Sequence, residues 1–147
     1  MKTLMNGIVV MMMVVATTAA QAQVKAISFA QLPKNAQSFI SKHYSEKNVS
    51  YITEESEFLS SAEYEVRLKD GKEIDFDSKG QWKEVDGKKK AIPAAIIPAP
   101  VVAYVKKSFP ENDIVKISRS SRRYEIELSN GLDLEFDKKG NFLRIDD

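Results

Sequence analysis

Two stretches of this chain nearly repeat each other. Residues 64–86 align without a gap on residues 124–146, and nine of the 23 aligned pairs are identical. Most of the other pairs keep their apolar or charged character. Self-similarity at a fixed spacing indicates a structural unit that is used more than once. The sequence therefore constrains the architecture of the protein more tightly than it constrains any chemistry.

The similarity continues upstream with a changed spacing. Ile27 and Pro33 correspond to Ile92 and Pro98, which lie 65 rather than 60 residues further along the chain. The first stretch therefore holds five additional residues, placed between about residues 53 and 63. These limits define two repeats, residues 27–86 and 92–146, joined by a short lysine-rich segment.

Each repeat is expected to contain one helix followed by four strands. Pro33 and Pro98 suit the first turn of a helix, where a missing N–H costs nothing, and apolar residues follow at helical spacing. The later segments alternate apolar and charged residues, and Asp70-Gly71 and Asn130-Gly131 are hairpin signals. The predicted fold class is α+β, with two tandem repeats, each one helix followed by a four-stranded antiparallel sheet. Whether the two sheets join is left open.

The alternation also predicts how each repeat packs. One face of each sheet is apolar and the other is charged, and the helix of the same repeat is the nearest cover for the apolar face. A unit of about 60 residues is only marginally stable alone. We therefore expect residues 23–147 to form a single domain.

The start of the chain is typical of an export signal. Lys2 precedes an unbroken apolar run from Ile8 to Val15, and Ala20-Gln21-Ala22 has the small-x-small form of a cleavage site. A membrane span needs about 20 apolar residues, more than this run provides. Residues 1–22 are predicted to be a signal peptide, with an uncleaved anchor as the alternative. Cleavage would leave a periplasmic or secreted protein without a membrane span.

The charge balance and the absence of cysteine exclude several classes of protein. The chain has 22 Lys and Arg against 21 Asp and Glu, so loss of Lys2 leaves 21 of each sign. Nucleic-acid binders normally show a basic excess, so no nucleic-acid partner is expected. With no cysteine, the domain has neither disulfides nor thiolate metal sites.

The residues that could carry chemistry have simpler structural explanations. His43 is the single histidine and lies at helical spacing from Phe39, so a structural role is expected. Glu73, Asp75 and Asp77 share one strand face and could hold calcium or exchange protons, but alternation alone requires polar residues there. Asp77 and its counterpart in the second repeat are expected to hydrogen-bond the following turn. We predict no catalytic residue, no cofactor and no metal.

Two features indicate where a partner would bind. Phe58 and Leu59 occupy the five-residue insertion. Exposing two large apolar residues in a hairpin loop is costly, so folding back onto the core is expected, with contact to a partner as the alternative. Three arginines cluster near the corresponding hairpin of the second repeat, where an acidic partner or an anion could dock. The candidate partner-binding residues are Phe58, Leu59, Glu73, Asp75, Arg119, Arg122 and Arg123.

Taken together, these segments resemble a known family. A helix that starts after Leu-Pro or Ile-Pro is followed by the Tyr64 strand, a glycine turn, and the sequence Phe76-Asp77-x-x-Gly80. This pattern resembles the PepSY-like, β-lactamase-inhibitor-like periplasmic proteins of Bacteroidetes type over nearly all of the mature chain. The resemblance implies tandem helix-plus-four-strand units and binding through an exposed sheet surface and hairpin loops. The shared positions are core or turn residues, so no inhibitory residue is implied.

The sequence therefore favours an exported, non-enzymatic binding module, such as an inhibitor or regulator of another protein. Its partner is expected to be a periplasmic or extracellular protein. The alternative is a carrier that holds a small or apolar ligand between helix and sheet. A third class, an enzyme that uses the acidic strand rows, is the least favoured.

Overall fold

The computed structural model describes residues 22–146. The predicted signal peptide, residues 1–22, lies almost entirely outside the described residues. The strands are β1 (Gln23–Ile27), β2 (Val49–Ser56), β3 (Glu63–Leu68), β4 (Glu73–Phe76), β5 (Trp82–Asp86), β6 (Ile114–Arg119), β7 (Arg123–Leu128), β8 (Asp133–Asp137) and β9 (Phe142–Asp146). The helices are α1 (Lys34–His43) and α2 (Ala99–Ser108), with short 3-10 turns at Phe29–Gln31, Glu46–Asn48 and Ala94–Ile96.

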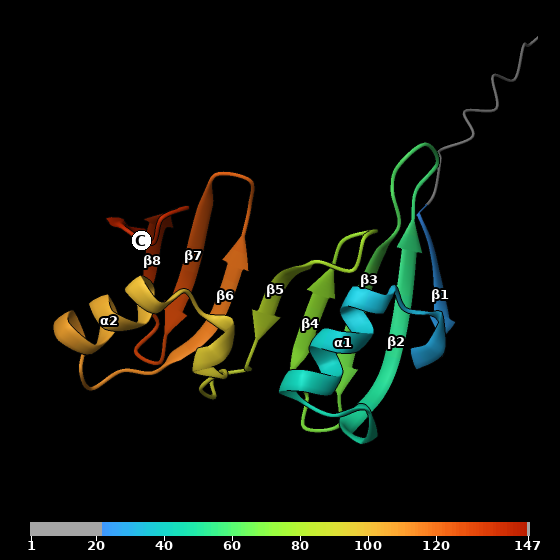
Figure 1. Cartoon of the computed structure of the whole chain (residues 1–147), viewed down its shortest axis with the longest axis horizontal. Coiled ribbons are helices and arrows are strands. Elements are labelled where there is room, and N and C mark those ends of the chain that lie inside the picture. The colour runs from blue at the N-terminus through green and yellow to red at the C-terminus, as the bar shows by residue number, and fades with distance from the viewer. Residues whose placement is uncertain (1–21, 147) are drawn as a thin grey trace, which may run out of the picture.

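The strands form one continuous antiparallel sheet in the order of the sequence, from β1 to β9 (Figure 1). The predicted fold class, two repeats each with its own four-stranded sheet, is therefore wrong. The chain is mostly sheet, and β5 pairs with β6 through Val85 opposite Ile117 and Asp86 opposite Lys116. A free strand edge exposes unpaired backbone N–H and C=O groups. Pairing β5 with β6 satisfies the backbone groups along one edge of each strand. Those groups would be unpaired if the two repeats formed separate sheets.

Strand β1 is a second correction, because the sequence pattern did not indicate it. Its five residues are almost all exposed, and none of them is buried. It pairs with β2 along its whole length, from Gln23 opposite Ser56 to Ile27 opposite Ile52. Backbone pairing rather than side-chain burial holds it in place.

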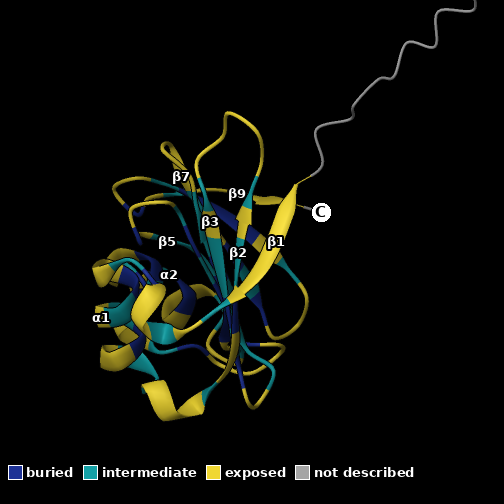
Figure 2. Cartoon of the chain, turned by 90° about the vertical axis from the view of Figure 1, so that its right-hand side faces the viewer, coloured by how far each residue is buried: buried dark blue, intermediate teal, exposed yellow. Residues whose placement is uncertain are grey.

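Both helices lie on the same side of the sheet and cover its apolar face (Figure 2). Ala36 and Ile40 of α1 and Val101 and Val105 of α2 are buried against this face. Helix α2 ends at Ser108, two residues before Pro110, which could not continue it. No helix among residues 22–146 is long and apolar enough to cross a membrane.

The turn between β4 and β5 fixes α1 against the sheet. The Asp77 carboxylate accepts hydrogen bonds from the backbone N–H groups of Lys79 and Gln81, both at 2.9 Å, which confirms its predicted role. Gly80 has φ +78, and a Cβ there would lie 2.8 Å from the backbone nitrogen of Ala36. A glycine is therefore needed both for the turn and for the close approach of the helix.

Candidate protein-interaction site

The sheet face opposite the helices is open, and its centre is acidic. Glu65 of β3 lies opposite Asp75 of β4, which in turn lies opposite Glu84 of β5. We call these three residues the acidic trio. Burial, followed by the neighbouring charges of Glu84, Glu65 and Glu73, raises the pKa of Asp75 to about 6. Like charges directly opposite each other destabilise a sheet, so the trio stores unfavourable electrostatic energy.

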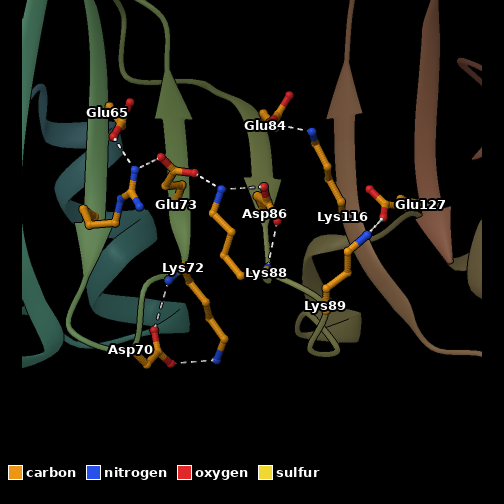
Figure 3. Close-up of polar contacts among 11 residues, drawn as sticks. Glu65, Asp70, Lys72, Glu73, Glu84, Asp86, Lys88, Lys89, Lys116 and Glu127 are labelled. Atoms are coloured by element: carbon orange, nitrogen blue, oxygen red, sulfur yellow. Dashed lines mark hydrogen bonds and ion pairs between the residues drawn. The ribbon is translucent and has the colours of Figure 1, made fainter. Parts of the chain in front are cut away.

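The next row of the open face is neutralised instead. Glu73 contacts both Arg67 and Lys88, and Lys88 also contacts Asp86 at 3.0 Å (Figure 3). Arg67 reaches Glu65 at 3.4 Å and lies over the ring of Tyr51. Glu73, one of the predicted partner-binding residues, is thus engaged in internal ion pairs, whereas Asp75 has no cation of its own among the ion pairs of the described residues.

The second half of the open face has a buried carboxylate, Glu135, that is paired with two arginines. Glu135 of β8 is 3% exposed and accepts hydrogen bonds from Arg123 and Arg144, each at 2.9 Å. A hollow of about 220 Å³ lies beside it on the same face. The described residues contain no group of three or more His, Cys, Asp or Glu side chains placed to hold a metal ion.

The β2–β3 connection carries the most exposed apolar side chains of the described residues. Phe58 is 78% exposed and Leu59 is 92% exposed, at the tip of a loop that projects beyond the sheet (Figure 1). The expectation that these two residues fold back onto the core is therefore wrong. Ser60 closes the turn, since its backbone N–H donates to the Glu57 carbonyl at 3.1 Å. We call Phe58 and Leu59 the apolar tip.

The three predicted arginines have different partners. Arg119 lies over the ring of Trp82 at 4.1 Å from its centroid. Arg123 pairs with Glu135, and the backbone N–H of Arg122 donates to the Ser120 hydroxyl within the hairpin turn. Trp82 was missed as a partner of Arg119, because the contact depends on the pairing of β5 with β6.

His43 packs against Phe39, with ring centroids 4.6 Å apart, as expected of a structural histidine. Burial, and then the charge of Lys42, lowers the pKa of His43. Neutral imidazole is therefore the form that this site favours.

Comparison with known proteins assigns the family. A family model described as β-lactamase-inhibitor-like and PepSY-like matches residues 18–60 and 62–144. The chain therefore belongs to the PepSY-like family, which confirms the resemblance seen in the sequence. The family is described as inhibitor-like and not as a family of enzymes. No curated protein matches the chain.

Several solved structures have the same fold. One, from Bacteroides thetaiotaomicron, is proposed to be a calcium-regulated periplasmic protein. It is 42% identical with a TM-score of 0.80, over 84% of this chain and 97% of that chain. Another, a proposed periplasmic protein of unknown function from Bacteroides vulgatus, is 38% identical with a TM-score of 0.79, over 86% and 100% of the two chains. A second protein from that species, also proposed to be periplasmic, is 35% identical with a TM-score of 0.78, over 84% and 97%. These relatives confirm the predicted periplasmic location.

Proposed function

We propose that this protein is a non-enzymatic binding module that docks onto another periplasmic protein through its apolar tip. The observation that carries the proposal is the exposure of Phe58 and Leu59 together at the end of a hairpin. Burying a side chain of this size against a partner contributes about 1.5–3 kcal/mol. Two neighbouring side chains of this kind are enough to anchor an interface, because a few residues usually carry most of the binding energy.

The backbone of the apolar tip supports the same proposal. Leu59 has φ 66, a left-handed conformation that is uncommon for a residue other than glycine. Such strain, about 1–3 kcal/mol, tends to be found at binding sites and clamps. A loop selected only to connect β2 and β3 would be expected to carry a glycine or asparagine at this position.

The acidic trio makes the open face favour a partner with a positively charged surface. Glu65 and Glu84 each contact one cation, but Asp75 between them contacts none in the ion pairs of the described residues. Acidic side chains on an open face attract a basic surface and increase the rate of encounter. We therefore expect the partner to present Lys or Arg opposite Asp75. Salt should slow association more than it speeds dissociation.

Capture from a periplasmic extract tests this proposal. Mature protein on a support should retain a specific partner, and Phe58→Ser combined with Leu59→Ser should reduce the retained amount at least tenfold, or about 1.4 kcal/mol. Val24→Ser with Leu143→Ser is the matched control, because it removes two exposed apolar residues elsewhere on the sheet. Equal retention by both double variants would show that the tip is not the docking site.

A carrier function is the second candidate, and one feature favours it. A hollow of about 270 Å³ lies beside α2 and is lined by apolar side chains that include Ile97, Val102 and Ile114. Native mass spectrometry of gently purified protein should then show a bound molecule, and Ala94→Trp should displace it by filling the hollow. Repeated absence of added mass would remove this candidate.

A further inference from the structure

Another hollow, of about 350 Å³, lies where the two halves of the sheet meet. It is formed by the β4–β5 turn, the start of β5, the β6–β7 hairpin and the turn after β8. Three cationic side chains line it: Lys83, Arg119 and Lys138. Pairing of β5 with β6 brings Trp82 and Lys83 beside Arg119, and Lys138 reaches the hollow from the turn that follows β8.

Arg119 is held in the hollow by two contacts with one residue. Its guanidinium lies over the indole ring of Trp82, 4.1 Å from the ring centroid. Its Nε donates a hydrogen bond to the Trp82 carbonyl at 2.6 Å. These contacts fix the plane of the guanidinium and use only one of its five N–H donors.

Lys138 is held in the same manner on the other side. Its Nζ lies 4.5 Å from the centroid of the Tyr124 ring and donates a hydrogen bond to the Ser120 carbonyl at 3.1 Å. Aromatic faces and carbonyl oxygens attract a cation without neutralising its charge. Both cations are thus positioned in advance for a negatively charged ligand.

The counter-charges nearby do not balance these two cations. Lys83 pairs with Glu63 at 2.5 Å, but the ion pairs formed by residues 22–146 include neither Arg119 nor Lys138. Asp77 is the carboxylate that lines the hollow, and it is engaged by the backbone N–H groups of its own turn. Burial lowers the pKa of Arg119 despite the opposing effect of Tyr124 and Asp77.

We propose that this hollow is an anion site that binds an oxyanion, a phosphate group or a carboxylate, between Arg119 and Lys138. A planar guanidinium offers paired donors that match two oxygens of such a group, and an ammonium adds a second charge. We call it the anion hollow. It is separate from the apolar tip, and it stands whether or not the tip docks onto a protein.

Tryptophan fluorescence tests the anion hollow directly, because Trp82 is the only tryptophan of the chain. The mature protein is titrated with inorganic phosphate, and separately with an acetylated and amidated Glu-Glu dipeptide, at ionic strength held constant with sodium chloride. We expect a saturable change with a dissociation constant of about 1 mM or lower for one probe or both. Saturation by phosphate alone assigns a phosphate group as the ligand, and saturation by the dipeptide assigns a carboxylate.

Charge-removing variants separate a specific site from general attraction. Arg119→Gln should weaken binding at least about tenfold. Lys138→Gln should weaken it about fivefold while leaving the Arg119–Trp82 stack in place. Lys139→Gln is the matched control, since it removes the same charge from the adjacent residue and should change binding less than about twofold. A linear response to both probes, or equal loss in Lys138→Gln and Lys139→Gln, would overturn the proposal.

Discussion

Asp75 and Glu135 occupy corresponding positions in the two halves of the sheet but have opposite surroundings. Both project from the middle of a strand onto the open face, and they are 60 residues apart in the aligned stretches. Glu135 is buried between two arginines, whereas Asp75 lies between two glutamates. One carboxylate therefore stabilises its half of the sheet, and the other destabilises it.

The difference arises from two substitutions. Arg144 of β9 corresponds to Glu84 of β5, and Arg123 of β7 corresponds to Glu63 of β3. Glu63 contacts Lys83 and Glu84 contacts Lys116, so neither position supplies a cation to Asp75. The like charges around Asp75 therefore lower the stability of the first half, a cost that the second half avoids by placing arginines beside Glu135.

Removing the two arginines that pair with Glu135 should give the largest effect on stability. Arg123→Met combined with Arg144→Met leaves a carboxylate that is only 3% exposed without a cationic partner. Removing the partners of a buried charge typically costs about 3–5 kcal/mol, and exposure of both arginines places the expected loss near the lower limit. Urea unfolding measures it, with Arg122→Met as a control from the same hairpin. A loss no larger than that of the control would show that Glu135 is not locked by these arginines.

Removing the charge of Asp75 should raise the stability of the protein rather than lower it. Its pKa in the folded protein is about 6, above the ordinary value of 3.8, so the folded state binds a proton more readily than the unfolded state. The stability linked to this group is complete below about pH 4 and is lost as the pH rises through about 6. Asp75→Asn should therefore stabilise the protein by about 1 kcal/mol at pH 7.5, after allowance for solvent screening, and by nothing at pH 4.

Thermal unfolding of Asp75→Asn and wild type across this pH range checks that sign. The difference between the two curves should grow from pH 4 to pH 7.5. A difference that is constant with pH, or that favours the wild type at pH 7.5, would contradict the raised pKa.

Replacing Glu84 by arginine, the residue at the corresponding position 144 of the second half, should give the smallest change in stability. Glu84→Arg places a cation opposite Asp75, as Arg144 lies opposite Glu135, but it also loses the contact of Glu84 with Lys116 at 3.2 Å. Cross-strand charge pairs contribute about 0.2–1 kcal/mol, so the net gain should stay below about 0.5 kcal/mol. The pKa of Asp75, followed by NMR titration of its carboxyl carbon, should fall clearly. An unchanged pKa would mean that burial alone raises it.

The sequence predicts which face of a strand each side chain lies on, but not which side chains pair with one another on that face. Alternation placed Asp75 and Glu73 correctly among the polar positions of β4, because burial of every second residue leaves a periodic pattern. The neutralisation of Glu73 depends on Lys88, which lies in the linker beyond β5 and carries no pattern of its own. The partners of a charge are set by register and by loop geometry, and neither is encoded by local periodicity.

The merging of the sheets was unpredictable for a related reason. The contact of β5 with β6 is made by backbone groups, which every residue possesses, and its register involves only residues 84–86 and 116–118. The exposure of the apolar tip was the less expected of two alternatives, because the cost of exposing large apolar side chains favours folding back onto the core. The anion hollow was anticipated only through Arg119, because Trp82 and Lys138 reach it through pairings between distant strands.

The strand order has a kinetic consequence. Because each strand pairs with the next one along the chain, most pairs form across short turns. The two long connections are those that contain α1 and α2, and the longer is the one between β5 and β6. Topologies with mostly local pairings fold faster than sheets of similar size with crossovers. The slowest step of assembly is therefore expected to be the meeting of β5 and β6, which also completes the anion hollow.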